Sequence, residues 1–387
     1  MADAAQEGDM MPQKTNWILV FALLTAGLFS AAQFGKLTLA LPVLRETYPE
    51  GGALVPLLIS VVGMVGILLG AVAGSVVARV GLARALISAL IAGGVLSLLE
   101  ATLPNLTSFA LLRVLEGISH LAIVIAAPTL IASSASDKDR SVVMGIWASF
   151  FGVSMAITAL VLPSLLALGG LPAVFYAHGL GMLVMALALF PLLPKERIAT
   201  PVPVSYLAEH RIIYSTPHLL IAGAGFVWYT IIYIALLAVL PVALKLPLWV
   251  VTALPLVSIV GTLWGGLLGK RISPDRLVVA GFVLTSAASV IVYLASPAIW
   301  PLFVLFFVMA LIPAASFAAI PYFNAAPTDR ARATGGIAQL GNVGTTTGTP
   351  IFVLVFDQVG LGGVCLTMVL FCGLGIVCTT LLRAKTK

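Results

Sequence analysis

The sequence predicts an all-α polytopic membrane protein, with twelve transmembrane helices arranged as two six-helix pseudo-repeats. Three observations predict this fold class: the composition, the spacing of apolar segments and a pattern that recurs in both halves. Of the 387 residues, 61% are hydrophobic and only 9% are charged, whereas soluble domains carry about 25% charged residues. So few charges would not cover a surface in water, so the bilayer is the expected solvent.

Twelve apolar segments are long enough to cross a bilayer, which takes about 20 mostly apolar residues per helix. They lie at approximately 17–43, 52–78, 83–103, 107–132, 141–166, 172–193, 217–244, 249–269, 276–295, 299–323, 334–356 and 361–382. The longest gap follows the sixth segment. We therefore predict a six-helix half over 1–194, a cytoplasmic linker over 195–216 and a second six-helix half over 217–387.

The basic residues are distributed unevenly between the loops. Sixteen of the twenty lie near the termini and in alternate loops, all on one side of the membrane if the twelve helices alternate. Basic loops stay on the cytoplasmic side of a membrane. Both termini are therefore expected in the cytoplasm, in a multi-pass protein of the inner or plasma membrane. The formal charge of +6 then reflects topology, and no nucleic-acid partner is expected.

No motif of an enzyme or of a cofactor site is present. The sequence has no Gly-x-Ser-x-Gly elbow, no His-Glu-x-x-His and no phosphate-binding Gly-x-x-x-x-Gly-Lys-Ser. Its three cysteines, Cys365, Cys372 and Cys378, share one apolar segment and lack metal-ligand spacing. We expect no catalytic residues, no cofactor and no bound metal. Because no ATP-binding segment exists, an ion gradient or passive flux would have to drive any transport.

The two predicted halves contain matching segments. "SDKDRSVVMGIW" precedes the fifth helix and "PTDRARATGGIA" precedes the eleventh. In each, an Asp-Arg pair is followed by a glycine six positions after the aspartate, from Asp139 to Gly145 and from Asp329 to Gly335. A chance similarity between two turns is the alternative. Matching placement in both halves favours a duplicated unit, which is typical of transporter folds with substrate bound near mid-membrane.

The turn after the second helix carries a further motif. "GSVVARVGLAR" matches a Gly-x-x-x-Asp-Arg-x-Gly-Arg-Arg pattern at Gly74, Arg79, Gly81 and Arg84, with Ala78 where the acidic residue is expected. With its six-plus-six plan and long central loop, the chain resembles the major facilitator superfamily over essentially its whole length. The resemblance implies rocker-switch alternating access, with the four matching residues in a gating role. The alanine puts a charge relay at this turn in doubt.

Three other segments refine this resemblance. In the fourth helix, Arg113 and Gly117 match an Arg-x-x-x-Gly pattern. The fifth helix lacks the Gly-Pro element of the antiporters, which disfavours drug/proton exchange. In the eleventh helix, however, "GTTTGTP" from Gly344 to Pro350 is similar to the glycine-proline element at the equivalent place in the second half. The run that begins at "RVLEGISH" also resembles the cyanate-permease-like branch.

Charged residues inside two predicted helices are the main site candidates. Arg113, Glu116 and His120 share one stripe of the fourth helix, and Gln33 and Lys36 share one stripe of the first. A charge at a helix centre costs about 2.5–3.5 kcal/mol on insertion scales, so these residues should pair or line a polar path. One interpretation is a structural ion-pair network. The other is a site in which Lys36, Arg113 and Gln33 bind an anion while Glu116 and His120 respond to protons.

Two further polar residues are expected to have no transport role. Glu100, near the outer end of the third helix, should be solvated, which leaves two cations against one carboxylate. His178, early in the sixth helix, is expected to be packed and hydrogen-bonded, with a proton carrier as the alternative.

The second half offers neutral site candidates instead of charges. Trp228 and Tyr229 lie in the seventh helix, and Gln339 and Asn342 lie in the eleventh. One charged wall facing one aromatic-amide wall suits a small organic anion, taken up with protons as the coupling ion. The alternatives are a polar aromatic heterocycle such as a vitamin or nucleobase, drug or metabolite efflux, and coupling to sodium. A monomer in the bilayer is expected, because the fold needs no protein partner.

Overall fold

The computed structural model describes residues 14–52, 54–194 and 205–386. Residues 195–204 of the predicted linker, with Lys195 and Arg197, lie outside the described residues. The described chain is helical between short turns, and it contains no β-strand. The all-α membrane fold predicted from the sequence is thus confirmed.

The helices follow each other closely along the chain. Those of the first half are α1 (Trp17–Leu39), α2 (Leu41–Thr47), the 3-10 turn η1 (Pro49–Gly51), α3 (Leu54–Val80), α4 (Leu82–Glu100), α5 (Leu106–Ser134), α6 (Arg140–Ala148) and α7 (Phe150–Leu189). The later ones are α8 (Tyr206–Ser215), α9 (Pro217–Ala243), α10 (Leu248–Leu268), α11 (Pro274–Leu294), α12 (Trp300–Met309), α13 (Leu311–Phe323) and α14 (Pro327–Lys385).

Ten helical stretches of the described chain are long and apolar enough to span a membrane. Two of them, α7 with 40 residues and α14 with 59, exceed the length of a single span. Each is bent at glycine: Gly169 and Gly170 in α7, and Gly360 in α14, have non-helical backbone angles. These bends fall in the gaps predicted after residues 166 and 356. The order of the apolar segments thus agrees with the prediction, whereas the count of twelve stays a prediction.

Local sequence explains where several helices begin. The side chain of Asn16 accepts a hydrogen bond from the backbone N–H of Leu19 at the start of α1, and Asn105 caps α5 in the same way. Such caps satisfy N–H groups that have no partner within the helix. Between α3 and α4 the chain turns at Gly81, whose φ of 99° is a left-handed value that favours glycine.

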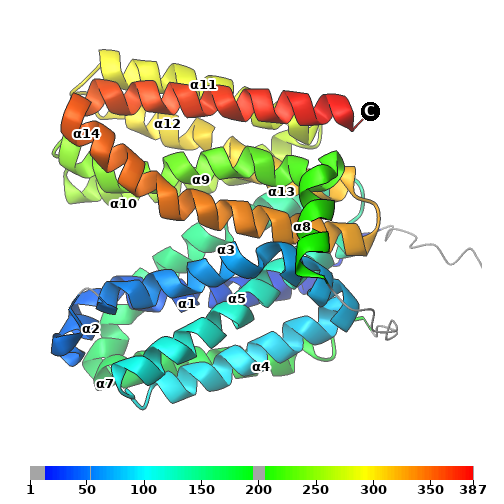
Figure 1. Cartoon of the computed structure of the whole chain (residues 1–387), viewed down its shortest axis with the longest axis vertical. Coiled ribbons are helices and arrows are strands. Elements are labelled where there is room, and N and C mark those ends of the chain that lie inside the picture. Colours follow the sequence, from blue (N-terminus) through cyan, green and yellow to red (C-terminus); the bar gives the residue numbers. More distant parts are fainter. Residues whose placement is uncertain (1–13, 53, 195–204, 387) are drawn as a thin grey trace, which may run out of the picture.

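The helices form two groups that separate in space (Figure 1). In that view α1 to α5 and α7 lie below, α9 to α14 lie above, and α8 crosses between the groups beside the C-terminus. We call the end with α8 and the turns at 81, 135–139, 269–273 and 324–326 the basic end. The opposite end, with α2 and the turns at 101–105 and 244–247, is the far end.

The hydrophobic cores show where the two groups join. One core contains residues of the first group alone, among them Leu37, Leu44 and Phe109 toward the far end. A second core lies entirely within α9 to α14. The third, largest core combines residues of both groups, such as Leu86 and Ala331. The halves are therefore held together mainly near the basic end.

Candidate functional site

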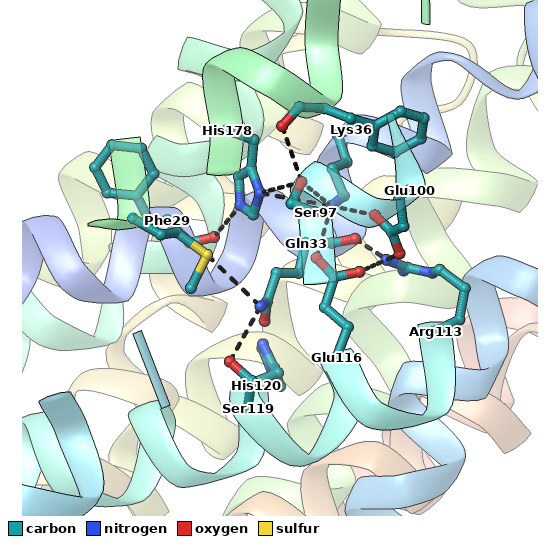
Figure 2. Close-up of polar contacts among 12 residues, drawn as sticks. Phe29, Gln33, Lys36, Ser97, Glu100, Arg113, Glu116, Ser119, His120 and His178 are labelled. Carbon is teal, nitrogen blue, oxygen red and sulfur yellow. Dashed lines mark hydrogen bonds and ion pairs between the residues drawn. The ribbon is translucent and has the colours of Figure 1, made fainter. Parts of the chain in front are cut away.

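Lys36 of α1 is the centre of a buried polar cluster (Figure 2). Its Nζ atom lies 2.6 Å from Glu116 Oε1 of α5, 2.7 Å from Glu100 Oε2 of α4 and 3.0 Å from Ser97 Oγ. The Lys36 side chain is 2% exposed, and both glutamates are fully buried. One ammonium group therefore bridges two carboxylates that come from different helices.

Arg113 of α5 completes this cluster. Its guanidinium pairs with Glu116 one turn along the same helix and lies 3.5 Å from Glu100. The remaining N–H groups donate to the backbone carbonyls of Leu58 on α3, at 3.1 Å, and of Gln33 on α1, at 2.9 Å. Four helices of the first half thus surround one arginine. A buried charge is tolerated at such a position only when it is paired and hydrogen-bonded in this way.

Glu100 is the residue that the sequence analysis misplaced. We expected it to be solvated at the outer end of its helix, but it is fully buried and pairs with both cations. The cluster therefore holds two cations and two carboxylates, so the expected excess of one positive charge is wrong. The sequence offered one signal for this burial, the spacing of Ser97 and Glu100, which are three residues apart on one face of α4. Both side chains contact Lys36.

Two histidines border this cluster in different ways. His178 of α7 places Nδ1 3.1 Å from Ser97 Oγ and Nε2 3.0 Å from the Phe29 carbonyl. The expectation of a packed, hydrogen-bonded His178 is thus confirmed. His120 places Nδ1 2.9 Å from both the hydroxyl and the carbonyl of Ser30. Its ring meets Phe34 edge-on, so it lies beside the ion pairs rather than among them.

Gln33 lies between Lys36 and the His120 side of the cluster. Its Nε2 donates to Ser119 Oγ at 3.3 Å, and the side chain is fully buried. Within the described part of the chain its Oε1 has no hydrogen-bond partner. A buried carbonyl oxygen without a partner is costly, so this atom is available to a bound molecule or water.

The aromatic candidates of α9 take two different positions. Trp228 packs against Phe371 of α14, with ring centroids 5.7 Å apart, and so lies within the second half. Tyr229 stacks on Tyr233 at 5.3 Å and contacts Phe226 at 5.7 Å. These three rings form a continuous aromatic row along α9, which Trp228 does not join.

Gln339 and Asn342 of α14 face the first half directly. Gln339 donates to the carbonyl of Ile67 on α3 at 2.6 Å and accepts from Tyr214 of α8 at 2.9 Å. Asn342 packs against Gly63 and Gly66 of α3, where an added methyl group would meet its side chain. Both residues therefore belong to a seam between the halves, which we call the α3/α14 seam.

The gating candidates lie at the basic end of the same seam. Gly74 faces the backbone of Ala331, and a methyl group there would come within 2.9 Å of the Ala331 carbonyl carbon. Arg79 lies 3.4 Å from Glu209 of α8. Gly81 forms the turn that follows, and Arg84 is exposed just beyond it. A side chain at Gly74 would hold the two helices apart.

A second seam joins α6 to α10, also at the basic end. Gly145 and Gly266 approach so closely that a methyl group on Gly145 would lie 2.6 Å from the Gly266 Cα. Lys270 Nζ lies 3.3 Å from Asp139 Oδ1. Nearby, buried Arg330 donates to Ser133 Oγ of α5 at 3.0 Å. The halves thus meet through glycine contacts and polar bridges at this end.

Comparison with known proteins identifies the family. The family model of the Major Facilitator Superfamily matches residues 19–248, which is more than half of the chain. The chain belongs to this superfamily. No match to a curated protein was found.

Solved structures of superfamily members superpose on nearly the whole chain. The human organic anion transporter MFSD10 (TETRAN) gives a TM-score of 0.75 at 16% identity, over 94% of this chain and 98% of that chain. The proton:xylose symporter XylE, bound to 6-bromo-6-deoxy-D-glucose, gives 0.75 at 11%, over 96% of each chain. The E. coli fucose:proton symporter FucP gives 0.73 at 16%, over 94% and 98%. At these identities the similarity establishes the fold.

Proposed function

We propose that this superfamily member is a secondary active transporter that takes up a small organic anion together with protons by alternating access. In this proposal 1–194 and 217–387 are the two rocking halves, and 195–216 is the linker. The basic end faces the cytoplasm of the cell membrane, because basic loops favour that side. No step requires a cofactor or a metal.

The neutral cluster of two cations and two carboxylates carries the proposal. Such charges are expensive inside a membrane protein and are typically found where they serve a path or a relay. If one carboxylate takes up a proton, a cation loses its partner and the cluster becomes positive. A bound anion restores neutrality, so proton and anion each favour the binding of the other. This reciprocal coupling is what a symporter requires.

Each member of the cluster has a role in this scheme. Lys36 and Arg113 attract the anionic group, and the Oε1 of Gln33 accepts a hydrogen bond from a hydroxyl or amine group of the same substrate. Glu116 contacts both cations and carries the coupled proton, with Glu100 as the second carboxylate. His120 is the second proton-responsive residue of this scheme, at the border of the cluster, where its Nδ1 lies 2.9 Å from the Ser30 hydroxyl.

One observation favours a second candidate substrate, a polar aromatic heterocycle such as a vitamin or nucleobase. The row of Phe226, Tyr229 and Tyr233 offers flat surfaces on which an aromatic ring can stack. We assign Trp228 to packing, and Gln339 and Asn342 to the α3/α14 seam, because their contacts lie there.

Ligand-induced stabilisation of the purified protein identifies the substrate class. The panel contains carboxylates, sulfonates, cyanate-like anions, nucleobases and vitamins, each at two pH values. A ligand of the native state raises the melting temperature with its concentration. We expect an anion to stabilise the protein more strongly at the lower pH. Stabilisation by neutral aromatic compounds alone would favour the second candidate substrate, a polar aromatic heterocycle, over an organic anion.

Transport of that ligand then tests coupling and direction. The protein is reconstituted into liposomes, and accumulation is measured with an imposed pH gradient of either sign. Accumulation along the inward proton gradient supports symport. Accumulation of the ligand under an outward proton gradient would mean exchange, and hence efflux in the cell. Accumulation that depends on sodium alone would overturn proton coupling. Empty liposomes and the exposed-carboxylate variant Glu46→Gln serve as controls.

A further inference from the structure

The α3/α14 seam brings basic residues from both halves to one place. On α3, Arg79 follows Ala78, the position where related chains are expected to carry an acid. On α14, Arg332 lies opposite, close to Gly74. Two guanidinium groups that face each other without an anion would repel and push the halves apart.

A carboxylate from a third segment lies between these arginines, although Arg332 also pairs with Asp329 of its own helix at 3.5 Å. Glu209 of α8 has Oε1 3.4 Å from Arg79 Nη2 and 3.3 Å from Arg332 Nη2. Its Oε2 lies 3.1 Å from Arg332 Nε and accepts the Ser75 hydroxyl. The side chain is 4% exposed. Glu209 therefore contacts basic groups of both halves at once.

The sequence of α8 holds Glu209 at this place. Ser205 caps the N-terminus of α8, and Glu209 lies in the first turn, where the helix dipole favours a negative charge. Tyr206 donates to the carbonyl of Leu68 on α3 at 2.7 Å, and Tyr214 donates to Gln339 on α14 at 2.9 Å. The two tyrosines thus fasten α8 across the seam, with Glu209 between them.

Glu209 is ionised at neutral pH. Burial raises its pKa, but the hydrogen bonds from Ser75 and Arg332 and the charges of Arg332 and Arg79 outweigh burial and lower the pKa below its ordinary value. The negative charge that bridges the two arginines is therefore present at neutral pH.

We infer that Glu209 is a gating residue, whose carboxylate replaces the missing acid at Ala78 and holds the basic end closed by bridging Arg79 and Arg332. The gate opens when α8 releases at least one of the two arginines. The role of this gate in transport rests on the proposed function. The closed contact itself does not, because it involves only residues of this chain.

A distance measurement between the halves tests this inference. Spin labels are attached at Val80→Cys and Thr328→Cys, two exposed positions at the basic end, after the three native cysteines are replaced by alanine. Distance distributions are recorded in liposomes without substrate. We expect Glu209→Gln to raise the ratio of open to closed molecules at least about fivefold, the lower end of typical coupling between linked sites.

The matched control is Asp137→Asn, which removes one carboxylate at the same end. Asp137 pairs with Arg140 within its own loop and is 80% exposed, so the distribution should stay as in the wild type. If Glu209→Gln changes the distribution no more than this control does, the inference is overturned. The result is independent of transport, so failure to find an anion substrate leaves it unaffected.

Arg332→Gln by itself covers the case in which Glu209→Gln expresses poorly, because it should also open the basic end; where both variants express, a double-mutant cycle tests the bridge. Arg332→Gln removes one of the two bridged cations and is measured alone and together with Glu209→Gln. Because the carboxylate acts through this arginine, the combined change should be smaller than the sum of the single changes. Additive changes would show that Glu209 and Arg332 act independently and would contradict the bridge.

Discussion

The interiors of the two halves differ in one respect that packing alone does not explain. The first half buries Lys36, Glu100, Arg113 and Glu116 between its helices. In the second half, described helix interiors hold hydroxyls such as Thr285 and Ser289, which donate to backbone carbonyls. Both halves nevertheless build helical bundles around apolar cores of their own. Charged residues buried in the described second half, Asp275 and Arg330, lie in the first turns of α11 and α14, whereas the four charges of the first half lie along its helices. The comparison favours a role for the first-half cluster beyond packing.

The largest expected effect comes from breaking the charged cluster. Arg113→Ala leaves two buried carboxylates with one cation, Lys36, and should lower the free energy of unfolding by about 3–5 kcal/mol. In the second half, Ser289→Ala removes one neutral hydrogen bond and should cost about 0.5–1.5 kcal/mol. Melting temperatures of the detergent-solubilised variants give the comparison. The charge-balanced pair Arg113→Met with Glu116→Gln should recover most of the loss. Equal costs at Arg113 and Ser289 would remove the contrast between the halves.

The next effect separates coupling from stability. Glu116→Gln keeps the shape of the side chain but removes the group proposed to carry the proton. We expect gradient-driven accumulation to fall at least about tenfold, which corresponds to about 1.4 kcal/mol of lost coupling. Exchange of labelled for unlabelled substrate should persist. Both rates are measured in the same liposomes. If this variant accumulates substrate as the wild type does, then either Glu100 carries the coupled proton or the cluster has a purely structural role.

A smaller effect is expected at the α6/α10 seam, where charges are exposed. Lys270 and Asp139 are partly solvated, and exposed ion pairs contribute about 0.2–1 kcal/mol. Lys270→Gln should therefore open the basic end less than Glu209→Gln does. The same inter-half distance measurement, with labels at Lys138 and Arg276, records both variants. A larger response to Lys270→Gln would reverse the ranking of the two seams.

The smallest effect is an expected absence of response between pH 7.5 and 5.5. Hydrogen bonding to Thr15 lowers the pKa of Asp139, although burial opposes it, and the pKa of Glu209 is also lowered. A lowered folded-state pKa means that stabilisation is lost only as pH falls through that lowered value, below this window. Opening of the basic end should therefore be unchanged when substrate is absent. His210, which contacts Gln339 at the seam, is replaced by glutamine in a control.

A response that survives His210→Gln would point to the buried cluster of the first half. Recording the same distances in Glu116→Gln then assigns it. If the pH response is lost in that variant, protonation of the cluster affects the opening of the basic end. Persistence of the response would show that the bridges of Glu209 or Asp139 loosen within this window.

The fold was predictable from the sequence for two reasons. A bilayer requires long apolar helices, and glycines mark where some of these helices bend. The bends at Gly169, Gly170 and Gly360 fall where the apolar segments were expected to end. The pairing of Arg113 with Glu116 follows from their spacing of three residues on one helix. Local periodicity is sufficient for each of these features.

Contacts between distant helices were not predictable in the same way. Glu100 and Lys36 are 64 residues apart, and helix depth alone suggested that Glu100 is solvated. Gln339 looked like a cavity residue, yet it contacts α3 and α8, which depends on how the halves dock. Glu209 gave no signal, because its short segment has neither a motif nor an apolar pattern.

The distance along the chain between Lys36 and its partners has a consequence for biosynthesis. Glu100 follows 64 residues later and Glu116 follows 80 residues later. At about 5–20 residues per second, α1 leaves the ribosome several seconds before either carboxylate exists. During that interval its lysine is an unpaired cation in an apolar helix, so α1 settles into place only when α4 and α5 arrive.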